Sequence, residues 1–195
     1  MKSYVELPEG YKEIYSVDLQ KNKKIAVLIN SLAVLICVAM IIPVHFIVPI
    51  TSLFDMSDGL GMYFIKLVAM FGGMVIYMIL HEFVHGITMR LSGTKKVKYG
   101  FTGMYAYAGS DDFYDKRTYI IIALAPVVVW GVVLAILNMI VPESWFWVVY
   151  FIQLTNISGA AGDYFVSCKF SKLPSDIIVR DYGVGMKVYS RNTDL

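Results

Sequence analysis

Five consecutive residues, His81-Glu82-Phe83-Val84-His85, combine two imidazoles and a carboxylate at a spacing that suits a metal site. In a helix, residues i and i+4 lie on one face, so His81 and His85 can both bind one ion. Glu82 lies beside that face, where its carboxylate can take a proton from water that the metal activates. The motif therefore predicts a Zn2+ site with Glu82 as the general base.

The motif lies within an apolar stretch. Residues 60–91 are almost all apolar, with Lys66 near the start and Arg90 near the end. Ionisable side chains are rare inside membrane helices, and those that occur there are generally functional. The alternative is a pair of core histidines hydrogen-bonded to neighbouring helices, which we consider weaker because buried polar groups are costly.

Composition indicates the class of protein. Of the 195 residues, 57% are hydrophobic and only 16% are charged, whereas soluble domains carry about a quarter charged residues. Four stretches, 25–50, 60–91, 119–140 and 145–165, reach the length of about 20 residues that crosses a bilayer. We predict an all-α integral membrane protein, a bundle of four transmembrane helices with small cytoplasmic strand or hairpin elements. Residues 1–195 would form a single membrane-embedded domain, and we expect no removable signal peptide.

The distribution of charge predicts the orientation in the membrane. Every Lys and Arg except Lys66 lies at or beyond the ends of these stretches, before the first, between the second and third, or after the fourth. The positive-inside rule then gives a multi-pass cell-membrane protein with both termini and the middle loop in the cytoplasm. These basic segments are interleaved with acids, which argues against nucleic-acid binding. Cys37 and Cys168 should lie at different depths, so we expect no disulfide.

Three segments outside the motif have predicted roles. Residues 1–24 suggest a short strand or an interfacial segment, and the Tyr- and Gly-rich residues 97–108 predict a hairpin. An extended substrate could pair with such a hairpin by strand addition, or the loop is interfacial with no substrate role. In the third stretch, Pro126 frees a backbone carbonyl and kinks the helix, at a depth similar to that of His81.

A catalytic zinc site needs a third protein ligand, and Asp163 is the best candidate. It follows a run of small residues, 158–162, that permits close helix approach. Asp163 is six residues from Lys169, about 9 Å along a helix, whereas His85 and His81 are about 7.5 and 13.5 Å from Arg90. One alternative is that Asp163 forms an ion pair at the end of its helix. Another is that the third ligand is Asp111, Asp112, Asp115 or His45, although His45 is predicted to lie toward the outer face of the membrane. Asn156, one to two turns deeper, could position substrate or join helices.

The HEFVHG segment, the Ala-Pro of the third stretch and the NISGAAGD run resemble a family of small bacterial membrane proteins described as "putative zincin peptidases". More distantly, the plan is similar to that of intramembrane site-2-type metalloproteases. The resemblance implies that His81, His85 and Asp163 bind zinc, that Glu82 is the base, and that Asn156 matches an upstream asparagine. Tyr164 stands where the larger family has glycine.

These patterns predict a zinc metallopeptidase that hydrolyses peptide bonds near the cytoplasmic interface. Its partners would be a membrane protein or peptide substrate and the lipid bilayer. One alternative is a catalytically silent zincin-like assembly or immunity partner, in which Glu82 has no evident purpose. Another is a small transporter with a proton or metal path, which four spans without an inverted repeat make less attractive.

Overall fold

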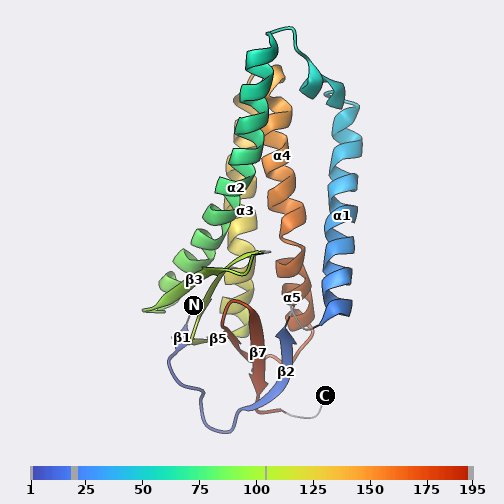
Figure 1. Ribbon diagram of the computed structural model, residues 1–195. Helices are drawn as coiled ribbons and strands as arrows, with labels where there is room; N and C mark the ends of the chain where they lie inside the picture. Colours follow the sequence, from blue (N-terminus) through green and yellow to red (C-terminus); the bar gives the residue numbers. More distant parts are fainter. Residues whose placement is uncertain (1, 19–21, 104, 193–195) are drawn as a thin grey trace. The chain divides into compact units, whose positions relative to one another are not determined.

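The computed structural model describes residues 2–18, 22–103 and 105–192. The chain divides into two compact units. The helical unit comprises Asn30–His81 and Val127–Ala161, and the sheet unit comprises Met1–Ile29, Glu82–Pro126 and Gly162–Leu195. Figure 1 shows the elements of each unit along the chain.

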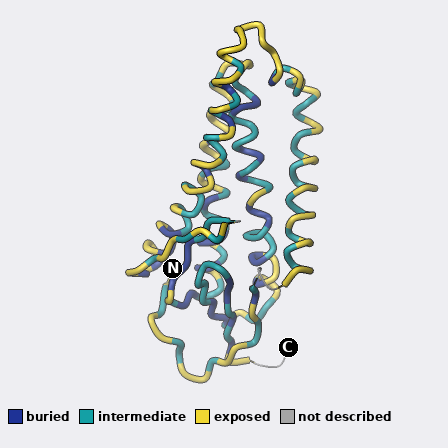
Figure 2. Tube along the Cα trace, in the orientation of Figure 1, coloured by how far each residue is buried: buried dark blue, intermediate teal, exposed yellow. Residues whose placement is uncertain are grey.

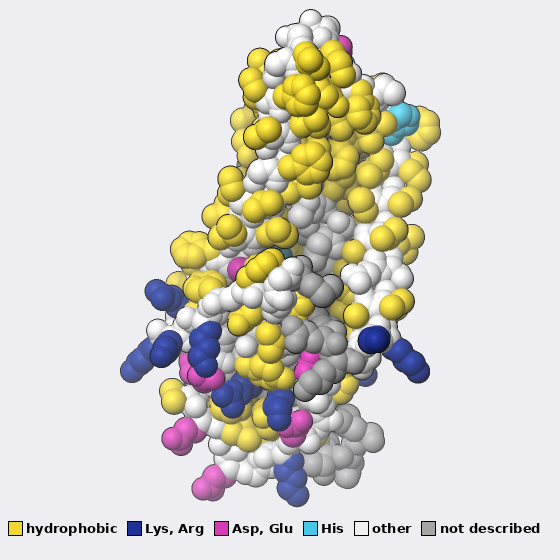
Figure 3. Space-filling view, viewed as in Figure 1, with side chains coloured by type: hydrophobic (Ala, Val, Ile, Leu, Met, Phe, Trp, Pro, Cys, Tyr) yellow, Lys and Arg dark blue, Asp and Glu magenta, His cyan; other side chains and the backbone are white. Residues whose placement is uncertain are grey.

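The helical unit consists of long apolar helices. Its segments come from α1 (Lys23–His45), the short 3-10 helix η1 (Ile50–Phe54), α2 (Leu60–Leu91), α3 (Lys116–Ile140) and α4 (Glu143–Gly159). Among the described residues, α1, α2 and α3 are long and apolar enough to cross a membrane. Most of α1 is coloured as exposed or intermediate in Figure 2, and apolar side chains cover the helices in Figure 3.

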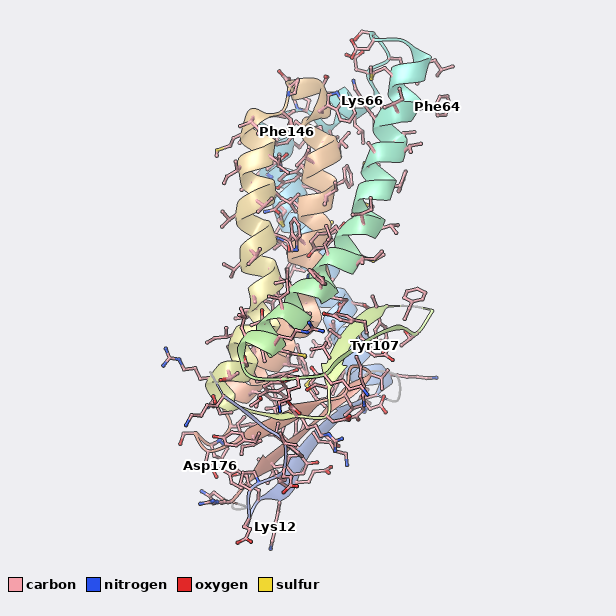
Figure 4. The ribbon with its side chains drawn as sticks, turned by 90° about the vertical axis from the view of Figure 1, so that its left-hand side faces the viewer. Lys12, Phe64, Lys66, Tyr107, Phe146 and Asp176 are labelled. Carbon is pink, nitrogen blue, oxygen red and sulfur yellow. The ribbon has the colours of Figure 1, made fainter. Side chains whose placement is uncertain are left out.

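A small core packs η1 against α2 and α4. Leu53, Met70, Trp147 and Val148 form a buried cluster, and the Trp147 indole N–H donates to the Pro49 carbonyl at 3.1 Å. Lys66, near the start of α2 (Figure 4), is only 3% exposed, and its ammonium pairs with Asp58 at 3.1 Å. That pairing explains how a lysine is tolerated inside an apolar helix.

The sheet unit is built on a five-stranded antiparallel sheet in the order β1-β5-β6-β7-β2. These strands are β1 (Ser3–Tyr4), β5 (Phe113–Asp115), β6 (Ile178–Asp181), β7 (Gly185–Ser190) and β2 (Lys12–Asp18). Strands β3 (Val97–Phe101) and β4 (Ala106–Ser110) form a separate two-stranded sheet. Lys and Arg side chains gather over this unit in Figure 3.

The core of the sheet unit lies between the five-stranded sheet and helix α5 (Ala161–Ser171). Tyr114, Phe170, Val179 and Val188 are completely buried, and the cluster includes Met89 and Ile122 from α2 and α3. Burial of apolar side chains from both helices fixes the C-terminal third of α2, from Glu82 on, and the first turns of α3 in this unit.

The predicted all-α fold is wrong, because the chain contains two β-sheets. The hairpin expected over 97–108 is present as β3 and β4, and residues 1–24 do contain strands, but β5, β6 and β7 were not predicted. These strands are three to six residues long. Strand β6 pairs with the neighbouring β7, but β5 pairs with β6 and β2 with β7 across long sequence separations. The periodicity within each segment is too short to reveal these strands.

The fourth predicted span, 145–165, is also wrong as a single helix. Helix α4 ends at Gly159, and a new helix, α5, begins at Ala161. Glycine is a poor helix former, and the break falls within the run of small residues, 158–162. The first helix ends at His45 rather than at 50. Cys37 and Cys168 are both free, as expected, whereas the single domain and the cytoplasmic termini stay predictions.

Candidate metal centre

The two motif histidines lie one turn apart on the continuous helix α2. Each offers a ring nitrogen and Asp163 offers a carboxylate oxygen, and these three ligand atoms all lie within 4.8 Å of one another. The helix supplies the His81–His85 spacing without help from the rest of the fold. The structure therefore brings together the three residues that the sequence proposed as metal ligands.

Asp163 reaches His85 from the first turn of α5. Its Oδ1 lies 3.7 Å from His85 Nε2, and the two side chains are 23% and 12% exposed. That distance is too long for a hydrogen bond. It is close to the separation of about 3.3–3.6 Å between two donors of one tetrahedral zinc with bond lengths of about 2.0–2.2 Å. The first turn of a helix also favours a carboxylate, because the unpaired N–H groups there carry partial positive charge.

His85 is held on its other side by the backbone of α3. Its Nδ1 lies 2.9 Å from the Ile122 carbonyl oxygen. A carbonyl only accepts hydrogen bonds, so Nδ1 must carry the proton and donate it. The lone pair is then on Nε2, the nitrogen that faces Asp163, as a metal ligand requires.

His81 is held by a chain of polar groups within the helical unit. The Tyr77 hydroxyl lies 2.7 Å from His81 Nδ1 and donates to Asn156 Oδ1 at 2.7 Å. Because that hydroxyl proton goes to Asn156, its oxygen accepts the proton of His81 Nδ1. His81, like His85, then keeps its lone pair on Nε2.

Further hydrogen bonds fix the side chain of Asn156. Its amide Nδ2 donates to the Val127 carbonyl at 3.3 Å and to Gln153 Oε1 at 3.4 Å. Gln153 in turn donates to the Gly131 carbonyl at 3.2 Å. Asn156 is 0% exposed, so this arrangement places it in the support of His81 through Tyr77. Contact between Asn156 and substrate stays a prediction.

Glu82 lies under the β3–β4 hairpin. Its carboxylate accepts the backbone N–H of Ala108 on β4. Ala108 pairs with Tyr99 on β3, and the Tyr99 ring lies against Gly86, where a Cβ would collide with it. Gly86 is one helical turn after Glu82, so the hairpin covers the Glu82 face of α2. Tyr107, labelled in Figure 4, marks β4 of this hairpin.

None of the four rival ligands belongs to the group that could bind a metal in the described residues, and three of them have structural partners. Asp115 accepts the Thr118 N–H at 2.9 Å at the start of α3, which is an N-terminal cap. Asp111 pairs with Lys98 at 2.6 Å and with Arg180 at 3.0 Å. His45 Nδ1 accepts the Ile50 N–H at 3.1 Å. Two imidazoles and one carboxylate therefore remain, the donor set of many catalytic zinc sites.

Sequence reasoning missed Asp181, a further carboxylate whose charge reaches the site. Burial raises the pKa of Asp181, although hydrogen bonds from the Tyr119 hydroxyl and the Gly183 N–H lower it, as does the nearby His85. The Tyr119 hydroxyl donates to Asp181 Oδ2 at 2.7 Å. Asp181 lies at the end of β6, an unpredicted strand, so only the sheet could have indicated its position.

The remaining contacts of the histidines carried a weak signal in the sequence. Tyr77 precedes His81 by four residues, the same spacing as that of His81 and His85, so all three lie on one helix face. Ile122 contributes a backbone atom, which no residue type can reveal.

The sequence of this chain is similar to a known protein family and to an individual protein. A family model described as "Putative zincin peptidase" matches residues 74–178, more than half of the chain and the whole of the site. An "Uncharacterized 24.7 kDa protein in gap 5'region" from Pyrococcus woesei is 34% identical over 119 residues, which are 58% of this chain. The chain spans about half, 51%, of the length of that relative. No solved structure matches.

Proposed function

The chain belongs to the family described as "Putative zincin peptidase", and we propose that it is a zinc-dependent peptidase acting within or at the surface of a membrane. The observation that carries the proposal is the convergence of the His81, His85 and Asp163 ligand atoms within 4.8 Å, beside Glu82. Bound by these residues, zinc would supply Lewis acidity toward a peptide carbonyl and would acidify water.

The chain's own residues would supply the proton transfers. Glu82 is adjacent to His81, and its carboxylate can take the proton of the attacking water and pass it to the leaving amine. The Ala108 N–H holds that carboxylate in place. A hydrogen bond from a fixed backbone group limits the rotamers of Glu82, so the base is oriented before substrate arrives.

The substrate would be an extended peptide or a locally unwound membrane segment, because a helical segment keeps its carbonyls bonded internally. In the described residues, β3 pairs only with β4, so the other edge of β3 is open to strand addition. Tyr99 and Phe101 on β3 are 47% and 69% exposed and offer apolar contacts. We place the protein in the cell membrane as a multi-pass protein with cytoplasmic termini, on the strength of its basic residues.

Metal analysis tests the first half of the proposal. We expect about one zinc per chain in the detergent-purified protein, lost in His81→Ala and reduced in Asp163→Ala, because a catalytic site needs three protein ligands. Asp176→Ala is the matched control, since Asp176 is a carboxylate of the same unit that binds Ser190 and Arg191 instead. Absence of zinc from the wild type, or equal loss in the control, would contradict the site.

Substitution of the base tests the second half. Glu82→Gln should keep its zinc and lose turnover by about 10²–10⁴-fold, the usual contribution of a general base. The assay is mass-spectrometric detection of cleavage in a mixture of peptides of known sequence, with protein in lipid nanodiscs. Equal cleavage by wild type and Glu82→Gln would refute the mechanism. Bound zinc with no cleavage by either protein would favour the silent assembly partner.

A further inference from the structure

Pro126 lies inside α3, and its side chain is fully buried. In an α-helix, the N–H of residue i binds the carbonyl of residue i−4. Proline has no N–H, so the carbonyl four residues before Pro126, that of Ile122, lacks its usual partner.

The freed carbonyl is the one that binds His85. The Ile122 oxygen lies 2.9 Å from His85 Nδ1. Ile122 is 1% exposed, so water has little access to this carbonyl and the imidazole N–H satisfies it. A buried carbonyl is rarely left without a donor. The two buried groups, one on α2 and one on α3, thus satisfy each other.

This contact determines which nitrogen of His85 can bind a metal. Because Nδ1 donates to the carbonyl, the lone pair is on Nε2, which lies 3.7 Å from Asp163 Oδ1. An N–H at position 126 would compete for the same oxygen and would tighten the helix around it. His85 could then turn or change tautomer, and the ligand nitrogen would no longer be fixed.

We propose that Pro126 is a positioning residue of the metal centre, which keeps the Ile122 carbonyl available to fix the tautomer and orientation of His85. The inference rests on the proposed metal site but not on peptidase activity. A proline that only bends α3 would have no such link to one imidazole nitrogen.

The test replaces the proline in two ways. Pro126→Ala restores an N–H, and we expect zinc affinity, measured by competition with a chelating dye, to fall about 10- to 100-fold, the usual effect of losing a partner of a metal ligand. Lactic acid at position 126, the ester analogue of alanine, has alanine's side chain but no N–H and should restore most of the affinity. If the ester binds zinc as poorly as Pro126→Ala, the volume of the ring matters rather than the N–H, and the proposal is wrong.

Two controls separate this effect from general damage. Pro43→Ala removes the proline of another long apolar helix, α1, and Val166→Ala removes volume from the same core as Ile122. Neither should change zinc affinity by more than a few-fold. An equal loss of affinity in all the variants would overturn the proposal.

Nitrogen NMR reads the tautomer without metal. The chain has three histidines, so 15N-histidine labelling gives three imidazole patterns, and that of His85 is assigned by its absence in His85→Gln. At a pH well above the usual histidine pKa, wild-type His85 should be protonated on Nδ1, and Pro126→Ala should shift it toward Nε2. An unchanged pattern would overturn the role of Pro126. If the wild type bound no zinc, the proposed function would fail, and this measurement would still decide whether Pro126 fixes His85.

Discussion

Replacement of Tyr77 by Phe tests the support of His81 with the loss of one oxygen atom. The hydroxyl bridges His81 Nδ1 and Asn156 Oδ1, each at 2.7 Å, and Tyr77 is 4% exposed. The variant leaves two buried polar groups without this partner, at a cost of about 1–3 kcal/mol each. The ring should stay in place, because it packs edge-on against Trp130 with centroids 6.4 Å apart.

For the metal, the expected effect follows from the tautomer. Without the hydroxyl, His81 Nδ1–H loses its acceptor, and the form with the lone pair on Nε2 loses its advantage. Losing such a partner typically weakens metal affinity about 10- to 100-fold, or about 1.4–2.8 kcal/mol. We therefore expect the zinc affinity of Tyr77→Phe to be lower by this factor in a dye competition assay. Without metal, the imidazole nitrogen resonances of His81 should show a shift of the proton from Nδ1 toward Nε2.

Tyr150→Phe is the matched control. Its hydroxyl donates to the Met40 carbonyl at 3.0 Å in the same helical unit, so the variant also loses one oxygen and one hydrogen bond. It does not contact the histidines through that oxygen, and its zinc affinity should equal that of the wild type. Equal zinc affinity in Tyr77→Phe and Tyr150→Phe would refute the reasoning, even if both variants melt at lower temperature.

Two further predictions concern stability in the sheet unit. Gly86→Ala should lower stability by at most about 2 kcal/mol, because overpacking against the Tyr99 ring costs about 1–3 kcal/mol and alanine in a helix regains about 1 kcal/mol. The double variant with Tyr99→Ala should recover most of that loss in thermal unfolding, and no recovery would place the strain elsewhere. Asp176→Asn tests an acid-sensitive turn, since the Arg191 N–H and then the Ser190 hydroxyl lower the pKa of Asp176. A carboxylate whose pKa is lower in the folded state stabilises the fold at pH values above its unfolded-state pKa of about 3.9. This stabilisation is lost as the pH falls through the folded-state pKa. The variant should thus be less stable at neutral pH and approach the wild type below about pH 4, and a constant difference across pH would contradict this.

The candidate ligand set could be predicted from the sequence because its spacing is mostly local. His81 and His85 share a face of one helix whatever the rest of the chain does, and an apolar surrounding made their presence informative. Asp163 was found by matching depths along two helices. The structure brings Asp163 close to both histidines. The count from Lys169 to Asp163 is unaffected by the break between α4 and α5, because both residues lie on α5.

The five-stranded sheet could not be predicted from the sequence, because the pairing of its strands is mostly not local. Strand β6 has four residues and pairs with β5, more than sixty residues earlier, and with β7. Its alternation is too short to count as a pattern, and its stability comes from partners and from α5, not from its own composition. Asp181, at the end of β6, was hidden with it, as was the hydrogen bond from Ala108 that holds Glu82.

The contacts that orient the two histidines follow from what an apolar helix bundle can offer. A ring N–H buried among such helices needs an acceptor, yet helix carbonyls are normally occupied by their own backbone. One solution is a side-chain hydroxyl one turn away, and Tyr77 provides it for His81. The other is a carbonyl that its own helix has released, and only a proline four residues later releases one by covalent structure, as Pro126 does for Ile122. A tyrosine four residues before the motif and a proline in a later apolar helix are thus features that the chemistry of a buried imidazole requires, and they can be sought in sequence alongside the motif itself.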